Sequence, residues 1–101
     1  MIRLKLYVTG HTFSADRARA ALRDLERRLT TQGGEGHVFT EVIDVLDDPE
    51  SAGRDQVFAT PTLIKLAPGP QVRLFGDLSS ADKLIQGLKL DRGESRFAET
   101  A

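Results

Sequence analysis

The sequence of 101 residues contains no cysteine and no tryptophan. Without cysteine the chain forms no disulfide, holds no thiolate-bound zinc and performs no thiol chemistry. No apolar run approaches the roughly 20 residues that span a bilayer, and the first residues lack the apolar stretch and cleavage site of a signal peptide. We therefore expect a cytoplasmic protein with no membrane partner.

An excess of charge of either sign is also missing. The 14 Lys and Arg residues balance 15 Asp and Glu residues to a formal net charge of −1, which gives no overall attraction to nucleic acid. The length suits one domain. We expect residues 1–90 to form that domain, because they hold all the periodic segments, and residues 91–101 to be a mobile C-terminal tail.

The first half of the chain predicts a strand, a long helix and a second strand. Residues 4–8 are a short, β-rich apolar run. From Ser14, the predicted N-cap, apolar residues recur at steps of three and four, which predicts an amphipathic helix that ends in the glycine-rich segment 31–36. Residues 37–45 carry apolar side chains on both faces, which predicts a central strand covered from both sides.

The second half predicts a short helix, a hairpin and a last helix. Asp48 as N-cap and Pro49 at the first position are a helix-start signature, although Gly53 weakens the helix that follows. Strands at 62–66 and 71–75 flank a Pro-Gly-Pro turn and form an antiparallel hairpin. The last helix opens on a sequence that resembles a capping box, Ser79-Ser80-Ala81-Asp82, and buries Leu84, Ile85 and Leu88.

The predicted order is therefore β-α-β-α-β-β-α. A βαβ unit followed by a ββα unit, wound with a right-handed crossover, gives a mixed four-stranded sheet with helices on both faces. This is an α/β fold with the thioredoxin-like plan.

Pro61 lies directly before a core strand, in the segment Ala59-Thr60-Pro61-Thr62-Leu63. Thioredoxin-like folds place a cis peptide at such a proline beside their active site, and in this element order we expect a cis peptide here. Alternatively, Pro61 merely begins the strand, where its missing N–H does no harm.

Redox thioredoxins need Cys-x-x-Cys between the first strand and the first helix. Residues 9–14 hold no cysteine, so redox catalysis is excluded and we expect no enzyme.

Neither a metal site nor a cofactor site is expected. His11 and His37 are the only histidines, and without partners at ligand spacing they are predicted to be exposed loop residues. The glycines at 33, 34 and 36 lack the Lys-Ser/Thr of a phosphate loop. One group of acidic residues could hold a divalent ion, but we expect these residues to form a strand end and a helix cap instead. They are Asp44, Asp47, Asp48 and Glu50.

Four segments closely resemble the KaiB family of the bacterial circadian clock, from about Leu4 to Leu90. They are LKLYVTGHT (4–12), VIDVLDDPE (42–50), FATPTLIKL (58–66) and FGDLSSADKLIQGL (75–88). The resemblance implies a non-enzymatic protein that binds the N-terminal ATPase tier of a KaiC-type ATPase and kinase ring and modulates its phosphorylation cycle. It also implies KaiA or a clock-output histidine kinase as further partners. The longer loop at 31–36 and a tail without the family's acidic run leave KaiA open.

The resemblance further implies two folds. The resting form, a tetramer or dimer, has a rearranged C-terminal half, and the binding form is thioredoxin-like. Two packings of one sequence coexist only if they differ by a few kcal/mol, and the partner selects the competent one. The weakened helices and the three X-Pro bonds of the second half are compatible with such a switch, and equally with an ordinary poor helix and turn.

Site residues follow from the resemblance position by position. Arg17, Lys65 and Arg73 match basic residues at or near the family's partner surface. Gln56 stands at a partner-surface position where the family usually has lysine, which removes a possible ionic contact. Structural or fold-switch positions are matched by Pro61, Gly76, Asp77 and Gly87.

Two other functions remain open from the sequence. One is a KaiB-like sensory or adaptor domain acting on a histidine kinase pathway, although we expect no linker or kinase segment after Leu90. The other is a degenerate thioredoxin-like enzyme such as a glutathione-binding transferase, although we expect no all-helical second domain of the kind that such enzymes carry.

Lys89 stands where many family members have an acidic residue. A lysine near a helix C-terminus suits the helix dipole and an aspartate opposes it, by about 0.3–1 kcal/mol each. We therefore predict that Lys89, a fold-switch position, biases this chain toward the thioredoxin-like form. Size-exclusion chromatography and NMR should detect that form, and finding only the alternative tetramer would contradict the prediction.

Overall fold

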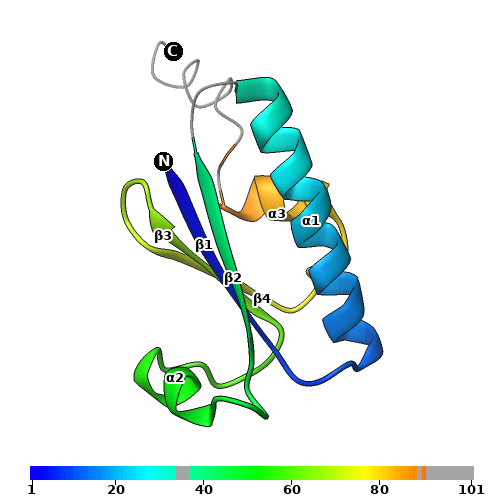
Figure 1. Ribbon diagram of the computed structural model, residues 1–101, viewed down its shortest axis with the longest axis vertical. Coiled ribbons are helices and arrows are strands. Elements are labelled where there is room, and N and C mark those ends of the chain that lie inside the picture. Colours follow the sequence, from blue (N-terminus) through cyan, green and yellow to red (C-terminus); the bar gives the residue numbers. More distant parts are fainter. Residues whose placement is uncertain (34–36, 89, 91–101) are drawn as a thin grey trace.

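The computed structural model describes residues 1–33, 37–88 and 90 (Figure 1). Lys89 and the predicted tail at 91–101 lie outside the described residues. Within the described part, no helix is long and apolar enough to cross a membrane. The elements, in the predicted β-α-β-α-β-β-α order, are β1 (Ile2–Val8), α1 (Phe13–Gly33), β2 (Val38–Asp44), α2 (Pro49–Arg54), β3 (Thr62–Ala67), β4 (Val72–Phe75) and α3 (Ala81–Leu88).

The four strands form one mixed sheet in the order β2-β1-β3-β4. β1 is parallel to β2 and antiparallel to β3, and β4 is antiparallel to β3. Because side chains alternate along a strand, Leu4, Leu6 and Val8 of β1 face one side of the sheet, whereas Lys5 and Tyr7 face the other. This alternation divides the core into two parts.

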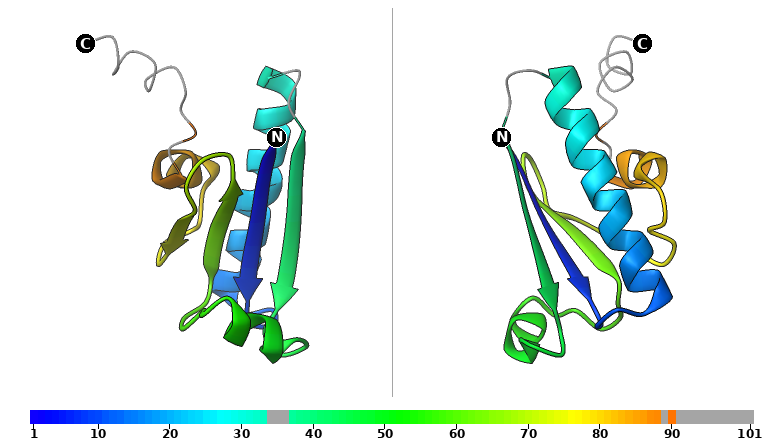
Figure 2. Two further views of the ribbon diagram at one scale, coloured as in Figure 1. Left: turned by 90° about the vertical axis from the view of Figure 1, so that its left-hand side faces the viewer. Right: turned by 45° about the vertical axis from the view of Figure 1, so that its right-hand side comes forward.

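The larger core lies between the sheet and helices α1 and α3, which lie together on one side (Figure 2). Leu25 of α1 and Leu84 of α3 are fully buried there against Leu6. The smaller core lies on the opposite face, beside α2, and consists of Tyr7, Ile43, Ile64, Val45, Ala52 and Val57. The predicted fold class, with helices on both faces, is therefore confirmed.

The prediction that 37–45 forms a central strand is wrong, because β2 lies at the edge of the sheet. The crossover through α1 places β2 beside β1, and β3 then pairs with the other side of β1. No strand is left to cover the outer edge of β2. Phe39 is accordingly 53% exposed and Val42 44% exposed. The apolar residues of this strand therefore lie partly at the surface and do not show that the strand is covered on both faces.

The N-cap predicted for the long helix is also wrong, by two residues. α1 begins at Phe13, and the hydroxyl of Thr12 accepts a hydrogen bond from the amide of Ala15 at 3.1 Å, as an N-cap does. Ser14 therefore lies inside the first turn. At the other end the helix continues to Gly33, three residues into the segment predicted to end it.

The two later helices begin almost as predicted. Asp48 caps α2, and its carboxylate accepts a hydrogen bond from the amide of Ser51 at 3.1 Å. α3 is capped by Ser80, whose hydroxyl accepts from the amide of Lys83 at 3.2 Å. The capping residue is thus one position after Ser79, where the capping-box pattern begins.

Gly87 allows α3 to lie close to β4. A Cβ atom at this position would lie 2.6 Å from a methyl carbon of Leu74 and 3.2 Å from its Cγ. Both distances are shorter than the contact distance of two carbon atoms. Gly87 therefore serves helix–sheet packing, in addition to weakening the helix as the sequence indicates.

The close contact between Gly87 and Leu74 can be tested by mutation. Gly87→Ala should destabilise the protein, because overpacking costs about 1–3 kcal/mol and the gain in helix propensity is only about 1 kcal/mol. In a Leu74→Ala background the obstructing methyl groups are gone, so the same change should raise the free energy of unfolding. Urea unfolding of both single variants and the double variant measures this. An equal effect of Gly87→Ala in the two backgrounds would show that the contact with Leu74 is unimportant.

Candidate functional site

The most exposed large apolar side chains gather at one end of the sheet. The strand directions bring the C-terminal ends of β1, β2 and β4 to the same end as the N-terminal end of β3, and both α2 and the start of α1 lie there (Figure 1). Four side chains from these loops and termini are more exposed than any other large apolar side chain described. We call them the apolar end: Phe13 at 76%, Leu46 at 68%, Phe58 at 92% and Phe75 at 67%.

The turn after α2 carries Phe58. The amide of Gln56 donates to the carbonyl oxygen of Gly53 at 3.1 Å, and the amide of Val57 donates to that of Ala52 at 2.9 Å. This pair of bonds is a Schellman motif, which requires a left-handed residue after the helix and usually has glycine there. Here Gln56 takes that conformation, with φ of 56°.

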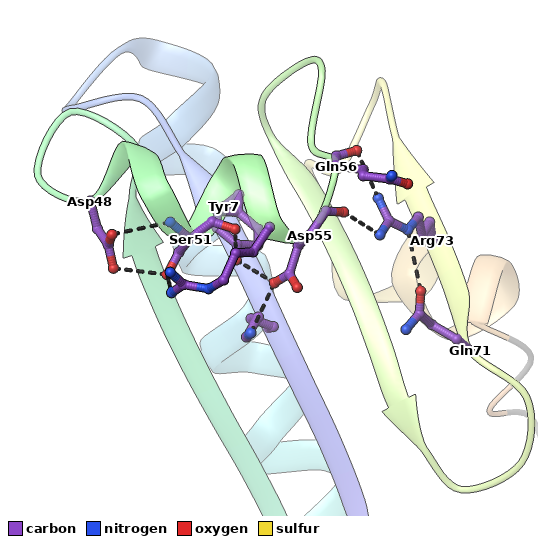
Figure 3. Close-up of polar contacts among 9 residues, drawn as sticks. Tyr7, Asp48, Ser51, Asp55, Gln56, Gln71 and Arg73 are labelled. Carbon is purple, nitrogen blue, oxygen red and sulfur yellow. Dashed lines mark hydrogen bonds and ion pairs between the residues drawn. The ribbon is translucent and has the colours of Figure 1, made fainter.

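Arg73 of β4 holds the same turn from the neighbouring strand (Figure 3). Its guanidinium donates to the carbonyl oxygen of Gln56 at 3.1 Å, to the carbonyl oxygen of Asp55, and to the side-chain oxygen of Gln71 at 3.3 Å. A cation at the last carbonyl groups of a helix is favourable because it complements the helix dipole. The donors of Arg73 are thus largely engaged within the protein.

Asp55 connects the end of α2 to β1 (Figure 3). Its carboxylate accepts a hydrogen bond from Lys5 Nζ at 2.9 Å and contacts the hydroxyl of Tyr7. That hydroxyl also lies 3.1 Å from the carbonyl oxygen of Ser51, and with a single proton it donates to one of the two oxygens at a time. Two side chains of the central strand therefore hold α2 on the sheet.

These contacts shift two pKa values in opposite directions. Hydrogen bonds from Tyr7 and then from Lys5 lower the pKa of Asp55, because they stabilise the carboxylate. Burial, followed by the hydrogen bond and the charge of Asp55, raises the pKa of Tyr7 from 10.0 to about 12. The pair therefore stays as a carboxylate and a neutral phenol across the physiological range.

A cavity of about 340 Å³ opens beside the apolar end, between the first turn of α1 and the turn after β4. The guanidinium of Arg17 lies at its rim, 5.2 Å from the ring centroid of Phe13, in cation–π geometry. Pro61 also lines the cavity, and its peptide bond to Thr60 is cis, as predicted.

Of the four predicted partner-surface residues, the structure brings only Gln56 and Arg73 into contact, while Arg17 lies on α1, on the other face of the sheet. Lys65 lies toward the hairpin end of β3, on the side of α1 and α3. Its side chain is buried, with 7% exposed, and Nζ donates to the carbonyl oxygen of Pro68 at 2.7 Å.

Of the residues predicted to be structural or fold-switch positions, Pro61, Gly76 and Asp77 lie near the apolar end, Gly87 lies in α3, and Lys89 is outside the described residues. Gly76 directly follows β4 and has φ of 97°, a conformation that favours glycine. Asp77 follows it and accepts a hydrogen bond from the amide of Ser79 at 3.2 Å. Lys83 pairs with the Asp77 carboxylate, and this contact lowers the pKa of Asp77 to about 2. Gly76 and Asp77 line the cavity together with Pro61.

Two of the four acids predicted to form a strand end and a helix cap, Asp44 and Asp48, do so. Asp44, at the end of β2, accepts hydrogen bonds at 3.0 Å from the amides of Gly10 and Leu46, and these bonds lower its pKa. Asp48 caps α2. Among the residues that the structure describes, no three His, Asp or Glu side chains are grouped to hold a metal ion, and His11 and His37 are both exposed.

Sequence reasoning missed the contacts of Asp55. A weak signal was present, because Lys5 and Tyr7 are two residues apart on a strand and must share a face. Nothing in the sequence indicated that their partner is 50 residues away from Lys5 along the chain.

Comparison with known proteins identifies the family. The chain matches the KaiB domain model over residues 5–90. It is 41% identical over 96 residues to circadian clock oscillator protein KaiB1 of Synechocystis sp., covering 95% of this chain and 88% of that protein. It is 44% identical over 91 residues to KaiB of Synechococcus elongatus, covering 90% and 85%. The chain belongs to the KaiB family.

Solved structures support the fold of this KaiB family member. The N-terminal domain of Synechococcus elongatus SasA superposes with a TM-score of 0.63 at 25% identity, covering 89% of this chain and 85% of that one. The thioredoxin Deadhead of Drosophila melanogaster gives a TM-score of 0.67 at 15% identity, covering 89% and 80%. The thioredoxin-like fold predicted from the sequence is thereby confirmed, and the match to the KaiB domain model confirms the resemblance to that family.

The electrostatics of the site can be measured directly, because Tyr7 is the only tyrosine in a chain without tryptophan. The ultraviolet absorbance of tyrosinate should give a midpoint near pH 12 in the folded protein. Since the pKa of Tyr7 is higher folded than unfolded, its contribution to stability is complete below pH 10.0 and is lost as the pH rises through about 12.

Asp55→Asn should move this midpoint toward 10.0, because it removes the charge that disfavours tyrosinate. A midpoint near 10.0 in a parent protein that circular dichroism shows to be folded would disprove the contact between Tyr7 and Asp55.

Proposed function

We propose that this chain is a non-enzymatic clock or timing protein of the cytoplasm that binds the N-terminal ATPase tier of a KaiC-type ATPase and kinase ring and modulates its phosphorylation cycle. Membership of the KaiB family supports this function. The observation on the molecule that carries it is the apolar end, where four large apolar side chains are exposed together.

The apolar end has the composition of a docking surface. Aromatic residues and arginine are enriched at the centres of protein–protein interfaces, and three of its four side chains are phenylalanines. Arg17 lies beside one of them, Phe13, and no ion pair of Arg17 is found among the described residues. A carboxylate of the partner can therefore pair with Arg17 while the phenylalanine rings are buried.

A change of fold is part of the proposal. The thioredoxin-like packing is the form that binds, and a tetramer or dimer with a rearranged C-terminal half is the resting form. Two features of the second half support a small energy difference between packings. α2 has only six residues, one of them Gly53, and Gln56 holds a left-handed conformation without being glycine. The ring would then select the binding form.

A second partner, KaiA or a clock-output histidine kinase, would need a second surface. The outer edge of β2 offers one, because an edge strand has unpaired backbone donors and acceptors. Phe39 and Val42 are exposed along it, on opposite faces of the strand. These features suit the addition of a strand from a partner.

One other function has support. The likeness to the N-terminal domain of SasA, at 25% identity, favours a sensory or adaptor domain acting on a histidine kinase pathway. Binding to a kinase of that pathway but not to a KaiC-type ring would support this second function over the first.

The experiment is co-elution with a KaiC-type ring in the presence of nucleotide. The parent protein should form a stable complex, and Phe58→Ala should weaken it by about tenfold or more, since aromatic residues at interface centres contribute that much. Phe39→Ala, on the edge of β2, is the matched control and should bind the ring as the parent does. Absence of a complex over hours, in every phosphorylation state of the ring, would refute the proposal.

A further inference from the structure

Asp55 joins three elements at the end of α2. Its carboxylate contacts Lys5 and Tyr7 of β1, and its carbonyl oxygen accepts a hydrogen bond from Arg73 of β4 (Figure 3). Lys5 and Asp55 are only partly exposed, with 22% and 30% of their side chains accessible. The charged contacts are therefore better shielded from water than an ordinary surface ion pair.

These contacts hold the segment 56–58. Gln56 has φ of 56°, a conformation that non-glycine residues leave unless their surroundings hold them in it. Its surroundings are the Schellman bonds of the turn and the guanidinium of Arg73, which bridges the carbonyl oxygens of Asp55 and Gln56. Without these bonds, the segment would relax toward other conformations.

Phe58 depends on this segment for its position. Val57 packs in the smaller core, whereas the side chain of Phe58 is 92% exposed and has little packing of its own to fix its direction. The backbone of the preceding turn therefore determines where the ring points. That turn is held by Asp55 from one side and by Arg73 from the other.

We propose that Asp55 is a positioning residue for partner docking. It fixes the segment 56–58, so that Phe58 is presented in one geometry before the partner arrives. This inference rests on the proposed function. A segment that is already ordered in the free thioredoxin-like form increases the affinity of that form, because the entropy loss on binding is smaller. Arg73 then acts through the turn and not by touching the partner.

The test compares Asp55→Asn with Asp47→Asn. Both remove one negative charge at the same end of the molecule, but Asp47 is exposed and makes no side-chain hydrogen bond or ion pair among the contacts of the described residues. Asp55→Asn should speed amide hydrogen exchange at 56–58 and lower the affinity for the ring, each by about tenfold, since a charge-assisted bond is replaced by a neutral one. Asp47→Asn should change neither.

The outcomes separate this inference from the proposed function. If the parent forms no complex with the ring, the proposed function fails, and hydrogen exchange alone decides whether Asp55 orders the segment. If the parent binds and Asp55→Asn binds equally well, the positioning role is wrong. Faster exchange across the whole chain would also overturn it, because that result indicates a purely structural role. Tyr7→Phe, which removes only the hydroxyl, repeats the test if Asp55→Asn fails to fold.

Discussion

The alternation of side chains along β1 is the constraint on which the rest of the structure depends. One set of side chains, with Leu6 at its centre, is buried under α1 and α3, and the other set faces α2. Tyr7 belongs to the second set and does two things at once. Its ring fills the smaller core, and its hydroxyl meets Asp55 at the end of α2. The same strand thus builds the main core and positions the end of the molecule where apolar side chains are exposed.

The parts of the fold that could be predicted depend on residues close together in the chain. The cap at Asp48 and the hairpin around Gly69 follow from local turn and helix chemistry, and the element order followed from periodicity. The position of β2 did not follow, because apolar residues on both faces of a strand do not distinguish a central strand from an edge strand. The contact between Lys5 and Asp55 did not follow either, since nothing local links residues 50 positions apart.

The site was predictable only through the family. Arg17, Gln56 and Arg73 were assigned by resemblance, and the fold brings Gln56 and Arg73 into contact but leaves Arg17 on the other face of the sheet. The structure changes what Arg73 does, because its guanidinium is engaged with the carbonyl groups of the turn after α2. It also brings in Phe58, which no residue pattern marks as a binding residue, because its exposure arises from the direction of a strained turn.

The central claim is that a KaiC-type ring binds the thioredoxin-like form at its apolar end. NMR of the isotopically labelled protein, with and without the ring, tests this most directly, because it maps the contact residue by residue. We expect signal loss centred on Phe13, Phe58 and Phe75, with the β3–β4 turn around Gly69 unaffected. Signal loss centred on that turn, with the apolar end unchanged, would contradict the claim.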